Sequence, residues 1–210
     1  TAFHLWVERQ FTDAATLFGD EYLDYLDPLD DDSKLEDLKA AWLKSSFANR
    51  TRLLLEVLHA VIEVWGSDRV GVRLSPYGAF NDMSDKDPIG LFTHVIEQLN
   101  PLNLAYLHLI EPRSTGAGGS DQVVKDVPST SELFKKVFKG KVIMAGGYDR
   151  DSAEAAVSSG EADAVAFGRL YISNPDLVER FAQNAALNPY DRSTFYGGTE
   201  KGYTDYPSLT

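Results

Sequence analysis

Two glycine turns come after the last two of four short apolar runs in this 210-residue chain. Gly146-Gly147 follows the third run, and Gly168-Arg169 follows the fourth. Glycine lets backbone amides approach an anion closely, and a nearby cation strengthens such a site. One turn by itself is explained equally well as a tight strand-to-helix connection. Two such turns in consecutive units favour a phosphate-binding site.

A single arginine, Arg73, lies inside the first apolar run, at residues 70–75. An isolated charge is costly to bury in a strand unless it meets a partner or an anionic ligand. An ion pair across the sheet is the alternative explanation. His59 and His108 also lie among apolar residues, and we interpret both as hydrogen-bonded packing histidines. Glu111 follows the second run.

Strand-like and helix-like segments alternate along the chain. Apolar residues at three- and four-residue steps predict a helix over residues 47–65, with an apolar face made of Leu54, Leu55, Leu58, Val61, Ile62 and Trp65. The predicted strands are residues 70–75, 104–110, 142–145 and 164–167, and the further helices are residues 88–99, 131–138 capped by Ser131, and 151–159 capped by Asp151. Such alternation indicates parallel strands joined by right-handed crossovers, in a closed barrel or an open sheet. The carboxyl ends of the strands are where chemistry gathers in these folds.

The composition excludes several classes of protein. The 43% apolar content is ordinary for a globular chain, and without cysteine there is no disulfide or thiolate ligand. Four scattered histidines offer no metal-ligand spacing, so we expect no metal site. The net charge of −12 disfavours nucleic acid as a partner. No run is long enough to cross a membrane and no leader pattern is present, so we expect a cytoplasmic protein.

A series of motifs in a fixed order resembles the old yellow enzyme family of FMN-dependent ene-reductases, especially its 12-oxophytodienoate-reductase-like members. The motifs are NRTR at 49–52, GVRLSP at 71–76, AGGY at 145–148, FGR at 167–169, ISNPDL at 172–177 and NPYDRSTFY at 188–196. The resemblance covers residues 46–210. It implies a (β/α)8 TIM-type barrel, of which this stretch is about the carboxyl-terminal half.

The resemblance also implies a cofactor, a reductant and a set of site residues. Family members hold FMN at the carboxyl ends of the strands, take hydride from NAD(P)H and reduce activated alkenes such as enones. Arg73 is similar to the arginine beside the flavin pyrimidine ring, where a cation stabilises the charge gained on reduction. The FMN phosphate site is expected at Gly146, Gly147, Gly168 and Arg169, and the substrate mouth at Phe195 and Tyr196.

The amino-terminal segment departs from the family pattern. Aligned on Gln10-Phe11, the family's carbonyl-binding pair and proton-donor tyrosine correspond to Thr1, His4 and Trp6, so that only His4 survives as a catalytic candidate. Residues 1–45 carry eleven acidic and four basic side chains and include an acidic, helix-prone insertion. We interpret them as an atypical segment: a remnant of the loop after the fourth barrel strand, followed by the insertion.

Three functions are compatible with these features. The first is an old-yellow-enzyme-type oxidoreductase that is truncated and has weak or no activity, because half of a barrel and the proton donor are missing. The second is a non-catalytic half-barrel that acts as an interaction or assembly module, with homo-oligomers formed through its exposed inner face. The third is an enzyme for a sugar phosphate, which Arg73 and the Phe195-Tyr196 pair disfavour.

Overall fold

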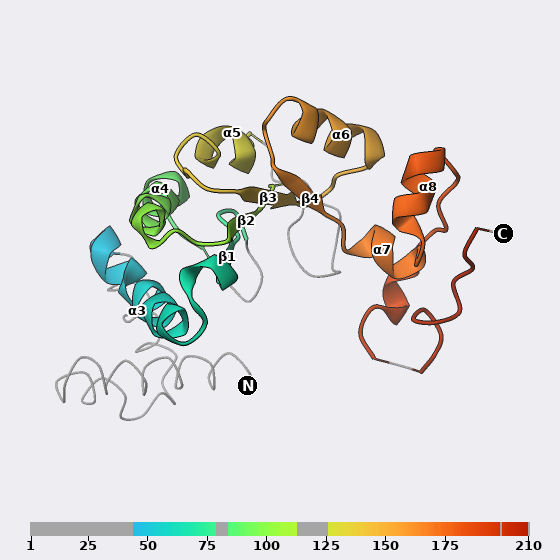
Figure 1. The fold of residues 1–210 in the computed structure, drawn as a ribbon, viewed down its shortest axis with the longest axis horizontal. Coiled ribbons are helices and arrows are strands. Elements are labelled where there is room, and N and C mark those ends of the chain that lie inside the picture. Colours follow the sequence, from blue (N-terminus) through green and yellow to red (C-terminus); the bar gives the residue numbers. More distant parts are fainter. Residues whose placement is uncertain (1–43, 79–83, 113–125, 198, 210) are drawn as a thin grey trace.

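A parallel four-stranded sheet lies at the centre of the protein (Figure 1). The computed structural model describes residues 44–78, 84–112, 126–197 and 199–209. The strands are β1 (Gly71–Leu74), β2 (Tyr106–Ile110), β3 (Val142–Ala145) and β4 (Ala164–Ala166), and they neighbour one another in that order. Every neighbouring pair is parallel. The predicted strands and their order are therefore confirmed, with ends that differ by up to two residues.

Helices precede and follow the strands, as the sequence pattern predicts. They are α3 (Phe47–Trp65), α4 (Pro88–Leu99), α5 (Thr130–Phe134), α6 (Arg150–Ser158), α7 (Arg169–Ser173) and α8 (Leu177–Gln183), with short 3-10 turns η2 (Ser67–Arg69), η4 (Asn100–Leu102) and η5 (Arg192–Thr194). In Figure 1, α4, α5 and α6 lie on the convex side of the sheet. Within the described ranges, no helix has the length and apolar character needed to span a membrane.

Two predicted helix caps are wrong. Helix α6 begins at Arg150, and its cap is Asp149, whose carboxylate accepts the Ser152 amide at 2.8 Å. The Ser152 hydroxyl accepts the Asp149 amide in return, a reciprocal capping box, so Asp151 lies in the first turn instead of at the cap. Helix α5 begins at Thr130, one residue before Ser131, because a distant carboxylate caps its first turn, as described below. It ends at Phe134.

The core lies between the sheet and its helices. Alternate strand residues face this side, and Leu107, Leu109, Val142 and Met144 are fully buried there. Helices contribute Ile96, Leu99 and Phe134, which are also fully buried. Alternation of side chains along each strand places the intervening residues on the other face of the sheet.

The predicted apolar face of α3 is only partly buried. Leu54, Leu55, Leu58 and Ile62 pack on the core, whereas Val61 and Trp65 are 37% and 62% exposed. Helix α3 packs mainly against one neighbour, α4, and a single helix neighbour covers a narrower stripe than the six residues span.

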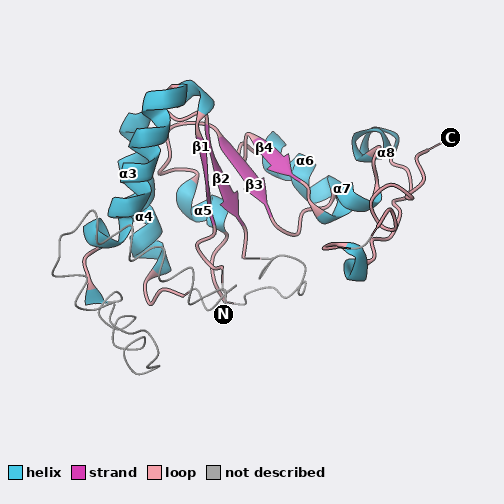
Figure 2. Ribbon diagram, turned by 90° about the horizontal axis from the view of Figure 1, so that it is seen from below, coloured by secondary structure: helices cyan, strands magenta, loops and turns pink. Residues whose placement is uncertain are grey.

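The opposite face of the sheet is the concave side in Figure 1, and none of the described helices covers it. Its residues come in cross-strand rows: Gly71 pairs with Tyr106, and Arg73 pairs with His108, followed by Ile143. Tyr106 is 39% exposed on this face. Figure 2 shows β1, β2 and β3 side by side with their arrowheads at one end, so their carboxyl ends share one edge.

Replacing Leu109 tests the position of the core. We expect Leu109→Ala to lower the free energy of unfolding by about 2–5 kcal/mol, because it leaves a cavity under the centre of the sheet. Val178→Ala is the matched control, since Val178 is 72% exposed. Urea unfolding followed by circular dichroism measures both changes. Equal losses in the two variants would contradict the assignment of the core.

Candidate functional site

The candidate site lies at the carboxyl edge of the sheet, where the segments after β2, β3 and β4 meet. The Glu111 amide donates to the Ala145 carbonyl at 2.8 Å, which holds the end of β2 against the end of β3. Because all the strands are parallel, Glu111, Gly146 and Gly168 leave the sheet on the same side. The fold therefore brings together the turns that the sequence singled out.

Glu111 organises this edge. Its side chain is 2% exposed and accepts the amides of Thr130 and Ser131 at 2.8 and 3.1 Å, together with the Ser129 hydroxyl. These bonds cap α5 from a strand eighteen residues earlier in the chain. The Tyr148 hydroxyl also donates to the carboxylate, at 3.2 Å. One buried carboxylate thus joins the end of β2, the start of α5 and the turn after β3.

Gly146 and Gly147 form a turn that requires glycine. Their φ angles are +107° and +75°, in the region that other residues rarely adopt. A Cβ on Gly146 would also lie 3.2 Å from the Glu111 carbonyl oxygen. For Gly146 the tight-turn explanation is therefore sufficient, while Gly147 extends the same turn at the carboxyl edge.

Gly168 differs from the first two glycines. Its φ of −96° is open to any residue, and a Cβ there would meet no atom within 4 Å. Neither backbone strain nor packing among the described residues accounts for a glycine at this position. Open space beside the backbone is what close approach of a ligand requires. Arg169 follows directly, as the first residue of α7.

Arg73 and His108 are cross-strand partners on the open face. Arg73 is exposed, and the described residues place no carboxylate within ion-pair distance of it, so the alternative of an ion pair finds no support in that part of the chain. Burial, and secondarily the Arg73 cation, lower the pKa of His108 below its ordinary value near 6.5. The neutral imidazole is therefore favoured in the folded protein.

The two histidines were wrongly interpreted as hydrogen-bonded packing residues. The buried Nε2 of His108 has no hydrogen-bond partner among the described residues, and His59 is exposed on α3. His108 lies on the open face, in the same cross-strand row as Arg73 and Ile143. An unpartnered buried nitrogen next to Arg73 marks a position that a ligand or another segment completes.

The two predicted aromatic residues differ in exposure. Phe195 is 7% exposed and Tyr196 is 71% exposed, with ring centroids 6.5 Å apart and nearly perpendicular. Tyr190 links them to the glycine turns: its ring centroid lies 5.6 Å from that of Phe195 and 5.8 Å from the Arg169 guanidinium carbon. A cation–π contact attracts the Arg169 guanidinium to the Tyr190 ring, which the Arg192 guanidinium carbon also approaches, at 5.5 Å.

Sequence reasoning missed three residues of this region. Glu111 and Tyr190 were noted only as a strand end and as part of a motif. Tyr77, in the loop after β1, has a buried hydroxyl without a partner among the described residues; burial and the Glu111 charge raise its pKa. A carboxylate directly after an apolar strand was the one available signal for Glu111. His4 lies outside the described residues, as do Thr1 and Trp6, and their roles stay predictions.

Comparison with known proteins identifies the family. Residues 41–188 match the profile of the NADH:flavin oxidoreductase / NADH oxidase family. The chain belongs to this family. The chain is 48% identical over 164 residues to the putative 12-oxophytodienoate reductase 10 of Oryza sativa subsp. japonica, covering 77% of this chain and 51% of that protein. It is 45% identical over 166 residues to 12-oxophytodienoate reductase 1 of the same plant, covering 78% and 43%.

Solved structures show the same relationship. Morphinone reductase is 45% identical with a TM-score of 0.69, and the old yellow enzyme from Trypanosoma cruzi is 34% identical with a TM-score of 0.72. Each match covers 79% of this chain and 43% and 42%, respectively, of the known chain. The chain thus spans about half or less of the length of the relatives it matches. The TIM-barrel fold class is confirmed, as a partial barrel.

Family membership implies FMN as the cofactor and NAD(P)H as the reductant. The residues at the carboxyl edge fit such a group: Gly168 leaves free space beside its backbone, and Arg73 presents an exposed cation next to an unpartnered His108 nitrogen. A cation and bare backbone suit a phosphate and an electron-rich ring. Among the described residues, no group of three or more potential metal ligands gathers.

The His108 environment predicts a pH dependence of stability. The pKa of the His108 imidazole is near 6.5 in the unfolded chain and lower in the folded chain. Just below pH 6.5 the unfolded chain therefore binds more protons than the folded chain. Stability therefore falls as the pH drops through 6.5, and His108→Gln should lessen that fall. Urea midpoints at pH 7.5 and 5.5 measure it. The prediction fails if the wild type and the variant lose equal stability between these two pH values.

Proposed function

We propose that this chain binds FMN at the carboxyl edge of its sheet and forms part of an NAD(P)H-dependent ene-reductase. The observation that carries the proposal is the Gly168-Arg169 turn, where the backbone is bare, the space beside it is free and a cation follows. Such an arrangement suits an anionic oxygen better than any role in the fold. Bound FMN would supply hydride transfer, which no protein side chain provides.

The phosphate of FMN would lie between the two glycine turns. Gly146 and Gly147 are held there by Glu111, and Gly168 follows the neighbouring strand. Arg169 would supply the charged contact, with its guanidinium oriented by the Tyr190 ring. Backbone at the Gly146-Gly147 turn would need no rearrangement to receive an anion, because its shape is set by positive φ angles and by contacts with Glu111.

Arg73 would contact the pyrimidine end of the cofactor. It is exposed on the open face, and its neighbour His108 is held toward the neutral form, so the two do not repel each other. A fixed cation stabilises negative charge that gathers nearby. Arg73 would therefore hold and polarise the ring end, while Arg169 holds the phosphate end.

The substrate would be a small molecule of the enone type, bound near Phe195 and Tyr196. Relatives named as 12-oxophytodienoate and morphinone reductases support this class. Tyr196 is exposed and can contact a ligand, whereas Phe195 is buried beside the Tyr190 ring, and its backbone carbonyl accepts the Tyr203 hydroxyl at 3.0 Å. His4 would be the remaining member of the carbonyl-binding pair. The cytoplasmic location stays a prediction.

An assembly module is the second candidate function, and the open face favours it. Tyr106 is exposed there, and β1 and β4 form the two edges of the sheet within the described part of the chain. Unpaired edges and an uncovered face promote association with another chain. Light scattering after gel filtration, with and without FMN, separates the two: a dimer that binds no flavin would support the module.

Replacing Arg169 tests the proposed phosphate site. We expect Arg169→Ala to weaken FMN binding by about ten- to a hundredfold, because a charge-assisted contact is lost. Quenching of flavin fluorescence during titration measures the dissociation constant. Arg150→Ala is the control, since the Arg150 side chain is 46% exposed and pairs with Asp151 on the surface of α6. Equal affinity of the Arg169 variant and the wild type would remove Arg169 from the site.

The catalytic prediction concerns the 210-residue chain itself. We expect little ene-reductase activity even with saturating FMN, because a positioned hydroxyl and a carbonyl-binding pair each contribute about 10²–10⁴-fold, and the alignment on Gln10-Phe11 leaves only His4 of these groups. The flavin is reduced anaerobically, cyclohexenone is added and reoxidation is followed in the visible band. Reoxidation at about 1–10³ per second would show that another residue performs the proton transfer.

A further inference from the structure

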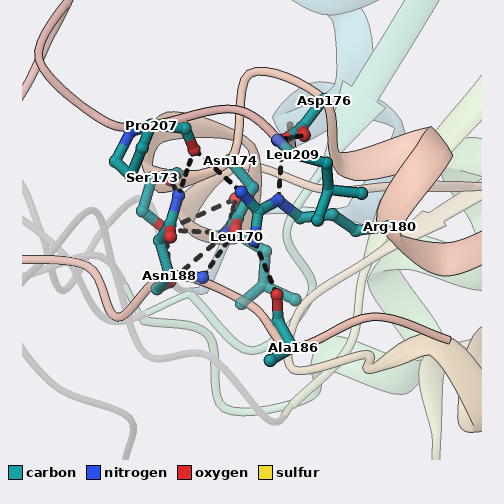
Figure 3. Close-up of polar contacts among 9 residues, drawn as sticks. All are labelled: Leu170, Ser173, Asn174, Asp176, Arg180, Ala186, Asn188, Pro207 and Leu209. Atoms are coloured by element: carbon teal, nitrogen blue, oxygen red, sulfur yellow. Dashed lines mark hydrogen bonds and ion pairs between the residues drawn. The ribbon is translucent and has the colours of Figure 1, made fainter.

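Buried polar side chains of the described residues gather mainly in two places. One is the Glu111 cluster, and the other lies where α7 ends and α8 begins (Figure 3). In the second, Ser173 and Asn174 are fully buried and Arg180 is 5% exposed. A charge this deeply buried needs several partners to offset the loss of hydration. The function proposed above assigns no role to this second cluster.

All three guanidinium nitrogens of Arg180 donate hydrogen bonds. Nε donates to Asp176 Oδ1 at 2.7 Å, Nη1 to the Ala186 carbonyl at 2.6 Å and Nη2 to the Pro207 carbonyl at 2.8 Å. Asp176 in turn accepts the Leu209 amide through its other oxygen, at 2.6 Å. One turn of α8 therefore binds the chain both just after the helix and near residue 210.

Asn188 closes the same point from the other side. Its Nδ2 donates to the Ser173 carbonyl at 2.9 Å and to the Pro207 carbonyl at 2.8 Å, while its amide donates to Asn174 Oδ1 at 2.7 Å. The Pro207 carbonyl thus accepts from both Arg180 and Asn188. Residues 188 and 207 meet there, and we call the described residues 188–197 and 199–207 the C-terminal loop. The two ends of this loop are joined directly by the hydrogen bond from Asn188 to the Pro207 carbonyl.

The closed ends of the C-terminal loop set the place of its aromatic rings. Tyr206, next to Pro207, accepts the Asp191 amide on its hydroxyl at 3.0 Å. Asp191 adjoins Tyr190, whose ring contacts Arg169 and Phe195. A continuous series of contacts therefore runs from the buried Arg180 to the cation expected at the phosphate.

We propose that Arg180 is a positioning residue of the flavin site: it holds the C-terminal loop so that Tyr190 orients Arg169 and so that Phe195 and Tyr196 lie at the mouth. This inference rests on the proposed FMN site. The planar set of N–H donors on the Arg180 guanidinium explains why an arginine occupies this position. An apolar side chain could fill the same space but would not fix the position of Pro207.

The test compares variants of the full chain in FMN titrations and visible spectra. We expect Arg180→Ala to weaken FMN binding about tenfold or more and to alter the spectrum of the bound flavin, because the aromatic rings lose their fixed place. Arg180→Lys keeps the charge beside Asp176 but loses the fork, so it should restore only part of the affinity. Arg69→Ala, at an exposed arginine near the amino end of β1, should match the wild type.

Asn188→Ala provides a milder variant should Arg180→Ala fail to fold, and we expect a smaller change in the same direction. A wild type that binds FMN, with folded Arg180 and Asn188 variants of unchanged affinity and spectrum, would overturn this inference and leave the proposed function standing. A wild type that binds no FMN would overturn both. If the variants show faster hydrogen exchange in the C-terminal loop but unchanged flavin affinity and spectrum, Arg180 only stabilises the loop. That result would also overturn the inference.

Discussion

The buried Glu111 carboxylate is the contact on which the carboxyl edge of the sheet depends. It receives donors from the start of α5 and from Tyr148, while its own amide binds β3. Its partners among the described residues are uncharged hydrogen-bond donors, and they matter because a buried carboxylate without hydrogen bonds is costly. The turn at Gly146 then has one available shape, since it passes within van der Waals distance of the Glu111 backbone.

An edge held by these hydrogen bonds would give a small sheet the fixed backbone that the proposed ligand site needs. Gly146 and Gly147 adopt positive φ angles that glycine tolerates without strain, and Gly146 packs against Glu111, whereas Gly168 has neither constraint and leaves open space. The contrast separates glycines that the fold needs from one that the fold does not explain. Binding an anion requires both a backbone held in place, as at Gly146 and Gly147, and free space beside the backbone, as at Gly168.

The charged groups of this edge include Arg73, Arg169 and the Glu111 carboxylate. Arg73 lies in β1, at one edge of the sheet, and Arg169 follows β4, at the other edge. The net charge of the protein is −12. The neutral form of His108 avoids a second cation beside Arg73. Buried arginine is used differently at Arg180, where a carboxylate and two carbonyls surround the guanidinium and hold the chain in place.

The sequence alone determined the features that depend on neighbouring residues. Local sequence patterns predicted α3 and α4 to within a residue, and the apolar runs predicted four parallel strands, because local propensity and side-chain spacing are properties of short segments. The glycine turns and Arg73 were also visible in the sequence, although it could not separate Gly146, which the turn requires, from Gly168, which it does not. The FMN family followed from motifs of several residues each.

Only the tertiary structure decided which distant residues meet. Glu111 caps a helix eighteen to twenty residues away, so the predicted cap at Ser131 was wrong, and Arg180 reaches Pro207 across 27 positions. The exposure of Val61, Trp65 and His59 depended on which neighbours α3 packs against. Such contacts form only when elements pack together. A local sequence pattern cannot predict them, because the residues next to a side chain do not determine its partner across the fold.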